Sequence, residues 1–242
     1  MFKKMTFLSL LLLSNFSLAC EHLGLGLPKQ SDQVNCLSGY AIGYNYKLKA
    51  ADWVAYRLVK QTWVGVDRQD DFREDLSIPE QYRTNADDYD EPVYDQGHLA
   101  NSESIDASIQ ANSETFLYSN IVPQLGKHNR SIWKGLENRE RKWAERYGEV
   151  WVYTAGLYRG KIQTIGKSNV PIPSDFWKII YVPSKQKVIA FLIPHKPLKT
   201  AQLKNYVVSV DKVEAETGLD LLSDLPDHIE YPLEATTSKF WR

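Results

Sequence analysis

The sequence predicts an α+β fold, in which one mixed domain contains many short strands and few helices. Short runs rich in β-branched and aromatic residues recur along the chain, as at 53–59 and 150–154. Helical signals are limited to a long segment at 129–147 and a shorter one at 211–218. The 242 residues, 43% hydrophobic and 24% charged, contain neither an internal repeat nor a low-complexity linker. One packed domain is therefore the expected organisation.

The first 19 residues have the pattern of a secretory signal peptide. A basic start precedes a mostly apolar stretch at 5–13, and small residues lie just before a cleavage point after Ala19. We therefore expect export to the periplasm or the medium, with a mature chain that begins at Cys20. A buried N-terminal helix and a lipoprotein are the alternatives. No later apolar stretch reaches the ~20 residues that a bilayer-spanning helix needs.

Export would place the only two cysteines, Cys20 and Cys36, in an oxidising compartment. A disulfide between them is the natural pairing and would close a short N-terminal loop, whereas two unpaired thiols are the alternative. Loss of residues 1–19 removes two lysines, which leaves 27 basic and 30 acidic residues and a net charge of −3.

Positive charge is concentrated in one segment of this acidic chain. Residues 127–146 contain seven basic and three acidic residues, so they carry +4 and the rest of the mature chain carries about −7. A basic helix of this kind is either a surface that faces phosphate groups or an ordinary solvated helix with salt bridges.

In the first half of the chain the elements are short. Residues 20–50 are rich in glycine and polar residues and are expected to form an irregular arm, which a strand at 53–59 follows. Residues 67–95 are acidic and contain two prolines, which is typical of a loop. The apolar run 115–118 then leads to an expected turn at 122–124.

The long helix is predicted at 129–147, because apolar residues recur there on one face of a 3.6-residue period, and Gly148 is a natural stop. That face consists of Ile132, Leu136, Trp143 and Tyr147.

A strand at 150–154 is expected next, and then a hairpin formed by 177–182 and 187–193. Residues 207–210 are a candidate last strand. Asp211 is then the expected N-cap of a helix that ends at Gly218.

Among five histidines, His98 has the most suggestive neighbours, in the run Asp95-Gln96-Gly97-His98. A neutral imidazole, with a pKa near ~6.5, suits a general base. Asp95 is close enough in the sequence to bias that imidazole. A satisfied structural histidine is the alternative interpretation.

A second candidate group lies on the long helix. Asn129, Trp133, Glu137 and Arg141 are each four residues apart, so they share one side of the helix. An amide oxygen, a carboxylate and a guanidinium on one side could hold a hydrated Mg²⁺ ion and an anionic substrate. A helix cap and an ordinary Glu–Arg pair are the alternative.

Several blocks in conserved order resemble the DNA/RNA non-specific endonucleases, a family with a ββα-metal (His-Me finger) site that includes endonuclease G-like and secreted bacterial nucleases. The blocks are Asp95-Gln96-Gly97-His98, residues 115–121, Pro123-Gln124, Asn129, Trp133, Leu136-Glu137 and Arg141. The resemblance covers roughly 50–220. It implies that 20–242 is a nuclease domain that hydrolyses phosphodiester bonds to 5′-phosphate and 3′-hydroxyl ends.

The resemblance also implies roles at the centre of the site. His98 would deprotonate the attacking water. Asn129 would be the one direct protein ligand of Mg²⁺, for which Mn²⁺ is an expected substitute. Glu137 would orient the waters around the metal.

Other residues are implied around this centre. Asn120 would position His98 or the metal shell, and Arg141 and Arg68 would supply positive charge to the phosphate. Arg68 shares its loop with Arg73 and Arg83, which are candidates for the same role. The family usually has Arg where this chain has Gln96, so this substrate-binding position lacks a fixed cation, with an expected effect on rate or affinity.

DNA and RNA are both expected as substrates, because the sequence contains no evident module for reading bases. The alternatives are a catalytically weak nucleic-acid-binding relative and a phosphodiesterase that acts on small nucleotides. No oligomeric state follows from the sequence.

Overall fold

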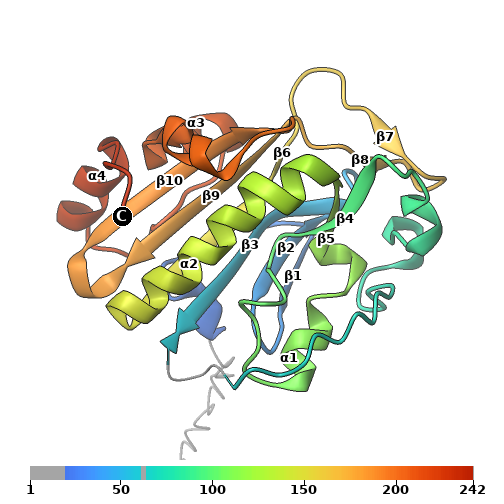
Figure 1. Ribbon diagram of the computed structural model, residues 1–242, viewed down its shortest axis with the longest axis horizontal. Helices are drawn as coiled ribbons and strands as arrows, with labels where there is room; N and C mark the ends of the chain where they lie inside the picture. Colours follow the sequence, from blue (N-terminus) through green and yellow to red (C-terminus); the bar gives the residue numbers. More distant parts are fainter. Residues whose placement is uncertain (1–19, 61–63, 242) are drawn as a thin grey trace, which may run out of the picture.

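A central antiparallel sheet of seven strands organises the protein in the computed structural model, which describes residues 20–60 and 64–241 (Figure 1). The strand order is β1-β2-β3-β6-β9-β10-β11. The strands are β1 (Gln33–Cys36), β2 (Ala41–Asn45), β3 (Ala50–Val59), β6 (Glu149–Leu157), β9 (Asp175–Val182), β10 (Lys187–Pro194) and β11 (Val207–Val208). The predicted signal peptide lies outside the described residues.

Two small ribbons and several helices complete the fold. The ribbons pair β4 (Tyr94–His98) with β5 (Ile121–Leu125) and β7 (Thr164–Ile165) with β8 (Val170–Pro171). The α-helices are α1 (Ile109–Glu114), α2 (Lys134–Tyr147), α3 (Val210–Thr217) and α4 (Asp227–Ala235). A π-helical turn, η6 (His128–Trp133), precedes α2. The 3₁₀ turns are η1 (Glu21–Leu23), η3 (Glu80–Tyr82), η4 (Ala86–Tyr89), η5 (Tyr118–Asn120), η7 (Pro183–Lys185) and η8 (Thr200–Tyr206).

Strand β9 lies in the middle of the sheet and is buried on both faces. Because side chains alternate along a strand, Phe176 and Ile180 join one core and Trp177 and Ile179 join the other. The first core contains the apolar side of α2, and the second contains the apolar side of α3. Helix α2 and helix α3 therefore cover opposite faces of the sheet (Figure 1).

The long helix, the strand at 53–59 and the hairpin of β9 and β10 are confirmed. The irregular arm was wrong, because 20–50 contains β1 and β2, whose pairing with the sheet stabilises two short, weakly patterned strands. The turn expected at 122–124 was also wrong, because these residues belong to β5, where a two-stranded ribbon tolerates a proline.

Two helix boundaries differ from the prediction in the last third of the chain. Helix α3 has its N-cap at Ser209, whose hydroxyl accepts a hydrogen bond from the Lys212 N–H, and Asp211 lies inside the first turn. The stop at Gly218 is confirmed. Helix α4 was not predicted, because Pro232 interrupts its helical signal.

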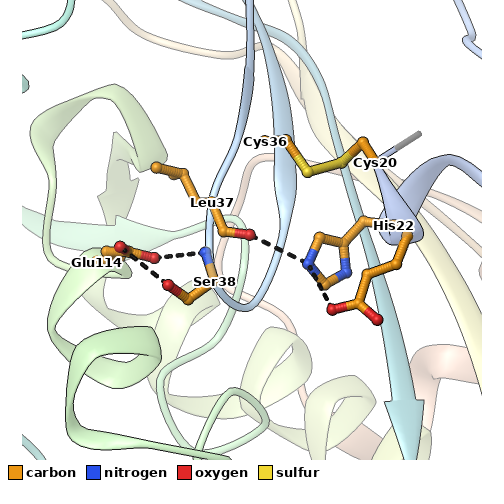
Figure 2. The surroundings of a disulfide bond; sticks show 7 residues. Cys20, His22, Cys36, Leu37, Ser38 and Glu114 are labelled. Atoms are coloured by element: carbon orange, nitrogen blue, oxygen red, sulfur yellow. Dashed lines mark hydrogen bonds and ion pairs between the residues drawn. A yellow bond between two sulfur atoms is a disulfide. The ribbon is translucent and has the colours of Figure 1, made fainter. Parts of the chain in front are cut away.

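The Cys20–Cys36 disulfide is confirmed and joins the start of η1 to the end of β1 (Figure 2). The two positions are 16 residues apart in the sequence, so the disulfide closes a short loop. Next to it, the imidazole Nε2 of His22 lies 3.2 Å from the carbonyl oxygen of Leu37 (Figure 2). These contacts fix the N-terminal segment against the edge of the sheet.

Within residues 20–60 and 64–241, none of the helices combines the length and the apolar character that a membrane span requires.

Candidate active site

A hairpin followed by a helix forms the frame of the site. In the β4–β5 ribbon, Gln96 lies opposite Pro123 and His98 lies opposite Ile121. Gln96 and His98 point to the same side because they are two residues apart on one strand. The chain continues from β5 through η6 into α2, so the helix follows the hairpin directly.

The hairpin and the helix enclose a polar pocket of about 170 Å³. Its lining residues are Arg68, Gln96, His98, Asn101, Glu103, Asn129, Arg130, Lys134 and Glu137. Five of the seven catalytic, substrate and metal residues predicted from the sequence therefore meet in one cavity. The other two, Asn120 and Arg141, lie behind its wall.

His98 is held between two aromatic rings at the end of β4. Its ring centroid lies 4.9 Å from that of Phe116 and 5.6 Å from that of Phe72. Nε2 is buried and meets no partner within the described part of the chain. Burial, with a smaller contribution from the Arg68 charge, lowers the pKa of His98 to about 3. The imidazole is therefore neutral at physiological pH and has a free lone pair.

The amide of Asn129 is oriented by a carboxylate. Its Nδ2 donates to Asp95 Oδ2 at 3.0 Å, and Asp95 Oδ1 lies 3.3 Å from an Arg130 guanidinium nitrogen. This bond leaves Asn129 Oδ1 free to accept a ligand in the pocket. The expectation that Asp95 biases His98 was wrong, because the Asp95 carboxylate engages the helix instead.

Glu137 lies in the first turn of α2 and is only 5% exposed. Burial raises its pKa to about 7, against the opposing charge of Lys178 and with a further rise from Glu140. A hydrogen bond to Asn101 stabilises the charged form. An amide oxygen and a carboxylate in a polar cavity are oxygen donors that fit a hydrated divalent cation.

The predicted positioning residue Asn120 is fully buried. Its side chain accepts from the Ala100 N–H at 2.8 Å and donates to the carbonyl oxygens of Ala100 and Thr115 at 3.0 and 2.8 Å. Its own carbonyl oxygen accepts from the Leu99 N–H. Asn120 thus fixes the two residues that follow His98 and does not reach the pocket.

Arg141 supports the wall of the pocket from behind. It donates to Asn101 Oδ1 at 3.1 Å and to Glu103 Oε2 at 2.8 Å. Arg68 lies in the pocket itself, where its guanidinium packs 4.7 Å from the Phe116 ring centre and donates to Ser102.

Arg73 and Arg83, the other candidates from the same loop, are used elsewhere. Arg73 pairs with Asp71 at 2.8 Å, and Arg83 donates to the carbonyl oxygen of Ile78 at 2.6 Å. Neither residue lines the pocket.

Four lining residues were not predicted as site residues, namely Asn101, Glu103, Arg130 and Lys134. Arg130 and Lys134 lie within the positively charged segment 127–146, but the sequence did not distinguish them from the other basic residues there. Asn101 and Glu103 follow His98 in an irregular segment, where no periodicity marks which side chains turn inward.

A histidine on a β-hairpin, an asparagine and a glutamate on the helix that follows it, and one shared polar pocket define a ββα-metal site. The model of the DNA/RNA non-specific endonuclease family matches residues 21–228, and this chain belongs to that family. It is a non-specific nuclease, a phosphodiester hydrolase, and the family is metal-dependent.

Relatives come from distant organisms. The chain is 33% identical over 209 residues to a nuclease of Nostoc sp., covering 81% of this chain and 75% of that protein. It is 34% identical to mitochondrial nuclease 1 of Schizosaccharomyces pombe, covering 84% and 69%, and 30% identical to mitochondrial endonuclease G of Homo sapiens, covering 80% and 70%. A crystal structure of the EndoG/EndoGI complex superposes with a TM-score of 0.80 at 27% identity, over 85% of this chain and 91% of that one.

Proposed function

We propose that this protein is an exported, Mg²⁺-dependent endonuclease that cleaves DNA and RNA without regard to the sugar and leaves 5′-phosphate and 3′-hydroxyl ends. The observation that carries the proposal is the convergence of His98, Asn129 and Glu137 on one polar pocket. The Cys20–Cys36 disulfide supports export, because such bonds persist in oxidising compartments.

His98 acts as the general base. The neutral imidazole lines the pocket and can accept a proton there from the attacking water. A bound phosphate is an anion and raises the pKa of His98 from its low value toward the working range. Phe72 and Phe116 fix the plane of the ring during this transfer.

Asn129 Oδ1, from the π-helical turn η6, would hold the metal, and Glu137, from the first turn of α2, would orient water in the same pocket. When bound, Mg²⁺ supplies Lewis-acid stabilisation of the charge that develops on the phosphate and on the leaving oxygen. Arg68, together with Lys134, faces the pocket and adds positive charge for the non-bridging oxygens.

A basic groove of about 670 Å³ lies beside the pocket along α2. Arg130 and Lys134 line both cavities, so the two are adjacent. Among the described residues that line the groove none is acidic, and its basic ones are Arg130, Lys134, Arg139, Lys142 and Arg146. Such a groove suits the phosphates of a chain that extends beyond the cleaved bond. It favours a polymer over a small nucleotide as substrate.

Digestion of plasmid DNA and of RNA with Mg²⁺, with and without EDTA, tests the proposal. His98→Ala should lower the cleavage rate by about 10²–10⁴-fold, because general-base catalysis is lost, and should leave DNA binding intact. His228→Ala, which changes an exposed histidine on α4, is the matched control and should cleave like the wild type. Wild-type rates in His98→Ala would refute the assignment.

The same assay separates the alternatives. A weak nucleic-acid-binding relative, with Gln96 as the mark of lost activity, would bind both polymers and cleave neither. A small-nucleotide phosphodiesterase would hydrolyse a dinucleotide and a polymer at similar rates. Lys142→Ala in the groove would not change the ratio of these two rates. We expect the polymer to be preferred, and the preference to fall in Lys142→Ala.

A further inference from the structure

One strongly acidic segment lies on the face of the sheet opposite α2. Residues 210–236, which span α3, α4 and their connection, contain eight acidic residues and one basic residue, a net charge of −7. The one basic residue, Lys212, is already paired with Glu216 at 2.6 Å. This region therefore lacks an internal cation for its remaining carboxylates.

Three of these carboxylates converge between the two helices. Oxygen atoms of Asp211 and Glu214 on α3 and of Glu234 on α4 all lie within 4.8 Å of one another. Glu214 also accepts a hydrogen bond from the Leu221 N–H at 2.7 Å, which fixes its orientation. Helices α3 and α4 thus meet through a group of like charges.

Glu234, the buried member of this group, indicates that the group binds a ligand. Glu234 is only 7% exposed, and its Oε1 has no hydrogen-bond partner within residues 20–60 and 64–241. A carboxylate that is removed from water is costly unless a cation or a proton accompanies it. The unpartnered oxygen belongs to the same carboxylate that faces Asp211 and Glu214.

We propose that Asp211, Glu214 and Glu234 bind a divalent cation, with Ca²⁺ as the preferred ion, which holds α4 against α3 at a second site remote from the catalytic pocket. Ca²⁺ bonds of about 2.3–2.6 Å let opposite ligand oxygens lie about 5 Å apart, whereas Mg²⁺ bonds of about 2.0–2.1 Å allow only about 4.2 Å. The three carboxylate oxygens lie within 4.8 Å of one another, a spacing that a single Ca²⁺ ion can span. Water fills the other positions around it.

Protonation of the Glu234 carboxylate is the alternative to cation binding. Burial, together with the neighbouring charges of Glu214, Glu230, Asp211 and Asp220, raises the pKa of Glu234 to about 8. The metal-free protein would then keep Glu234 protonated at neutral pH. Cation binding releases this proton, so the affinity for Ca²⁺ increases as the pH rises through this pKa.

Calorimetric titration of Ca²⁺ into the mature protein decides between the two occupants. All variants carry Asn129→Ala, so that the catalytic pocket lacks its proposed ligand. We expect one bound Ca²⁺ per chain with a Kd of about 10⁻⁴–10⁻³ M, as in other weak extracellular sites. Glu234→Gln should weaken binding at least about 10-fold, whereas Asp220→Asn, which removes an exposed charge from the same face, should stay within about threefold.

Thermal unfolding provides the check on folding. Saturating Ca²⁺ should raise the melting temperature by about 2–8 °C in the protein with Glu234 and leave it unchanged in Glu234→Gln. Without Ca²⁺, Glu234→Gln should melt at or above the parent temperature, because it removes a carboxyl group that must take up a proton on folding. Absence of Ca²⁺ binding in the Asn129→Ala protein, or equal binding in Glu234→Gln, would overturn the proposal. The result does not depend on the proposed nuclease mechanism.

Discussion

The two faces of the central sheet differ in how their buried carboxylates are neutralised. Beneath α2, the fully buried Glu140 pairs with Lys178 at 2.7 Å and accepts hydrogen bonds from Tyr56 and Ser104. On the other face, the buried Glu234 oxygen has no partner among the described residues. Lys178 neutralises Glu140 within the fold, so this carboxylate needs no ion from solution. The charge state of Glu234 depends instead on pH and on ions in solution.

Two helical segments on the opposite faces also differ in their net charge. The segment 127–146 carries +4 and the segment 210–236 carries −7. Nucleic acid is a polyanion, so the α2 face attracts it and the α3 and α4 face repels it. This asymmetry orients the substrate toward the pocket even though the mature chain as a whole is slightly acidic.

Removal of the internal cation should have the largest effect on stability. Lys178→Met leaves Glu140 buried and uncompensated, so the free energy of unfolding should fall by about 3–5 kcal/mol. Urea denaturation measures this change. A second substitution, Glu140→Gln, should restore more than half of the loss, because it removes the stranded charge. A loss below about 1 kcal/mol in Lys178→Met would show that the pair contributes little to the fold.

The Glu234 carboxylate on the opposite face should make the stability of the metal-free protein depend on pH. Because the pKa of Glu234 is raised from 4.5 to about 8 in the folded state, the folded protein binds more protons than the unfolded chain between these values. Stability of the metal-free protein should therefore fall as the pH rises from about 4.5 to 8. After allowance for solvent screening, Glu234 contributes about 1–2 kcal/mol to this fall in the free energy of unfolding.

Unfolding by urea at pH 5 and pH 8, in the presence of EDTA, measures this difference. Glu234→Gln should reduce the difference in stability between the two pH values, leaving the part that Glu137 contributes, and Asp220→Asn should retain most of the difference. A profile that is identical in the wild type and in Glu234→Gln would mean that Glu234 titrates normally.

The smallest expected effect concerns Gln96 on the basic side. Gln96 lines the pocket, so Gln96→Arg should increase substrate affinity and steepen the dependence of affinity on salt by about one unit. Turnover need not change, because ground-state and transition-state binding improve together. DNA binding across a salt series measures the slope. An unchanged slope would place residue 96 away from the phosphate, and a lower affinity would indicate repulsion by Arg68.

The sequence predicted the elements whose patterns are strong. The apolar period of α2 and the β9–β10 hairpin were found because each carries many consecutive signals. Strands β1 and β2 were missed because they are short and their stability comes from pairing with β3 rather than from their own composition. The π-helical turn that places Asn129 also has no distinct sequence signal.

The sequence indicated most of the residues that line the pocket, but not how the residues behind it are used. His98, Asn129 and Glu137 stood out because their spacing resembled a known family. The roles of Asn120 and Arg141 as supports of neighbouring segments, seen in their hydrogen bonds to Ala100 and to Asn101, depend on tertiary contacts that no local pattern encodes.

The central claim is that the α2 face forms a metal-dependent nuclease site around Asn129. Plasmid cleavage across a Mg²⁺ series, measured in parallel for the wild type, Asn129→Ala and Glu137→Ala, tests it most directly. The account predicts that Asn129→Ala needs a much higher Mg²⁺ concentration for half-maximal rate, whereas Glu137→Ala mainly lowers the maximal rate, with a loss of about 10–100-fold. The same half-maximal Mg²⁺ concentration in all three proteins would contradict it.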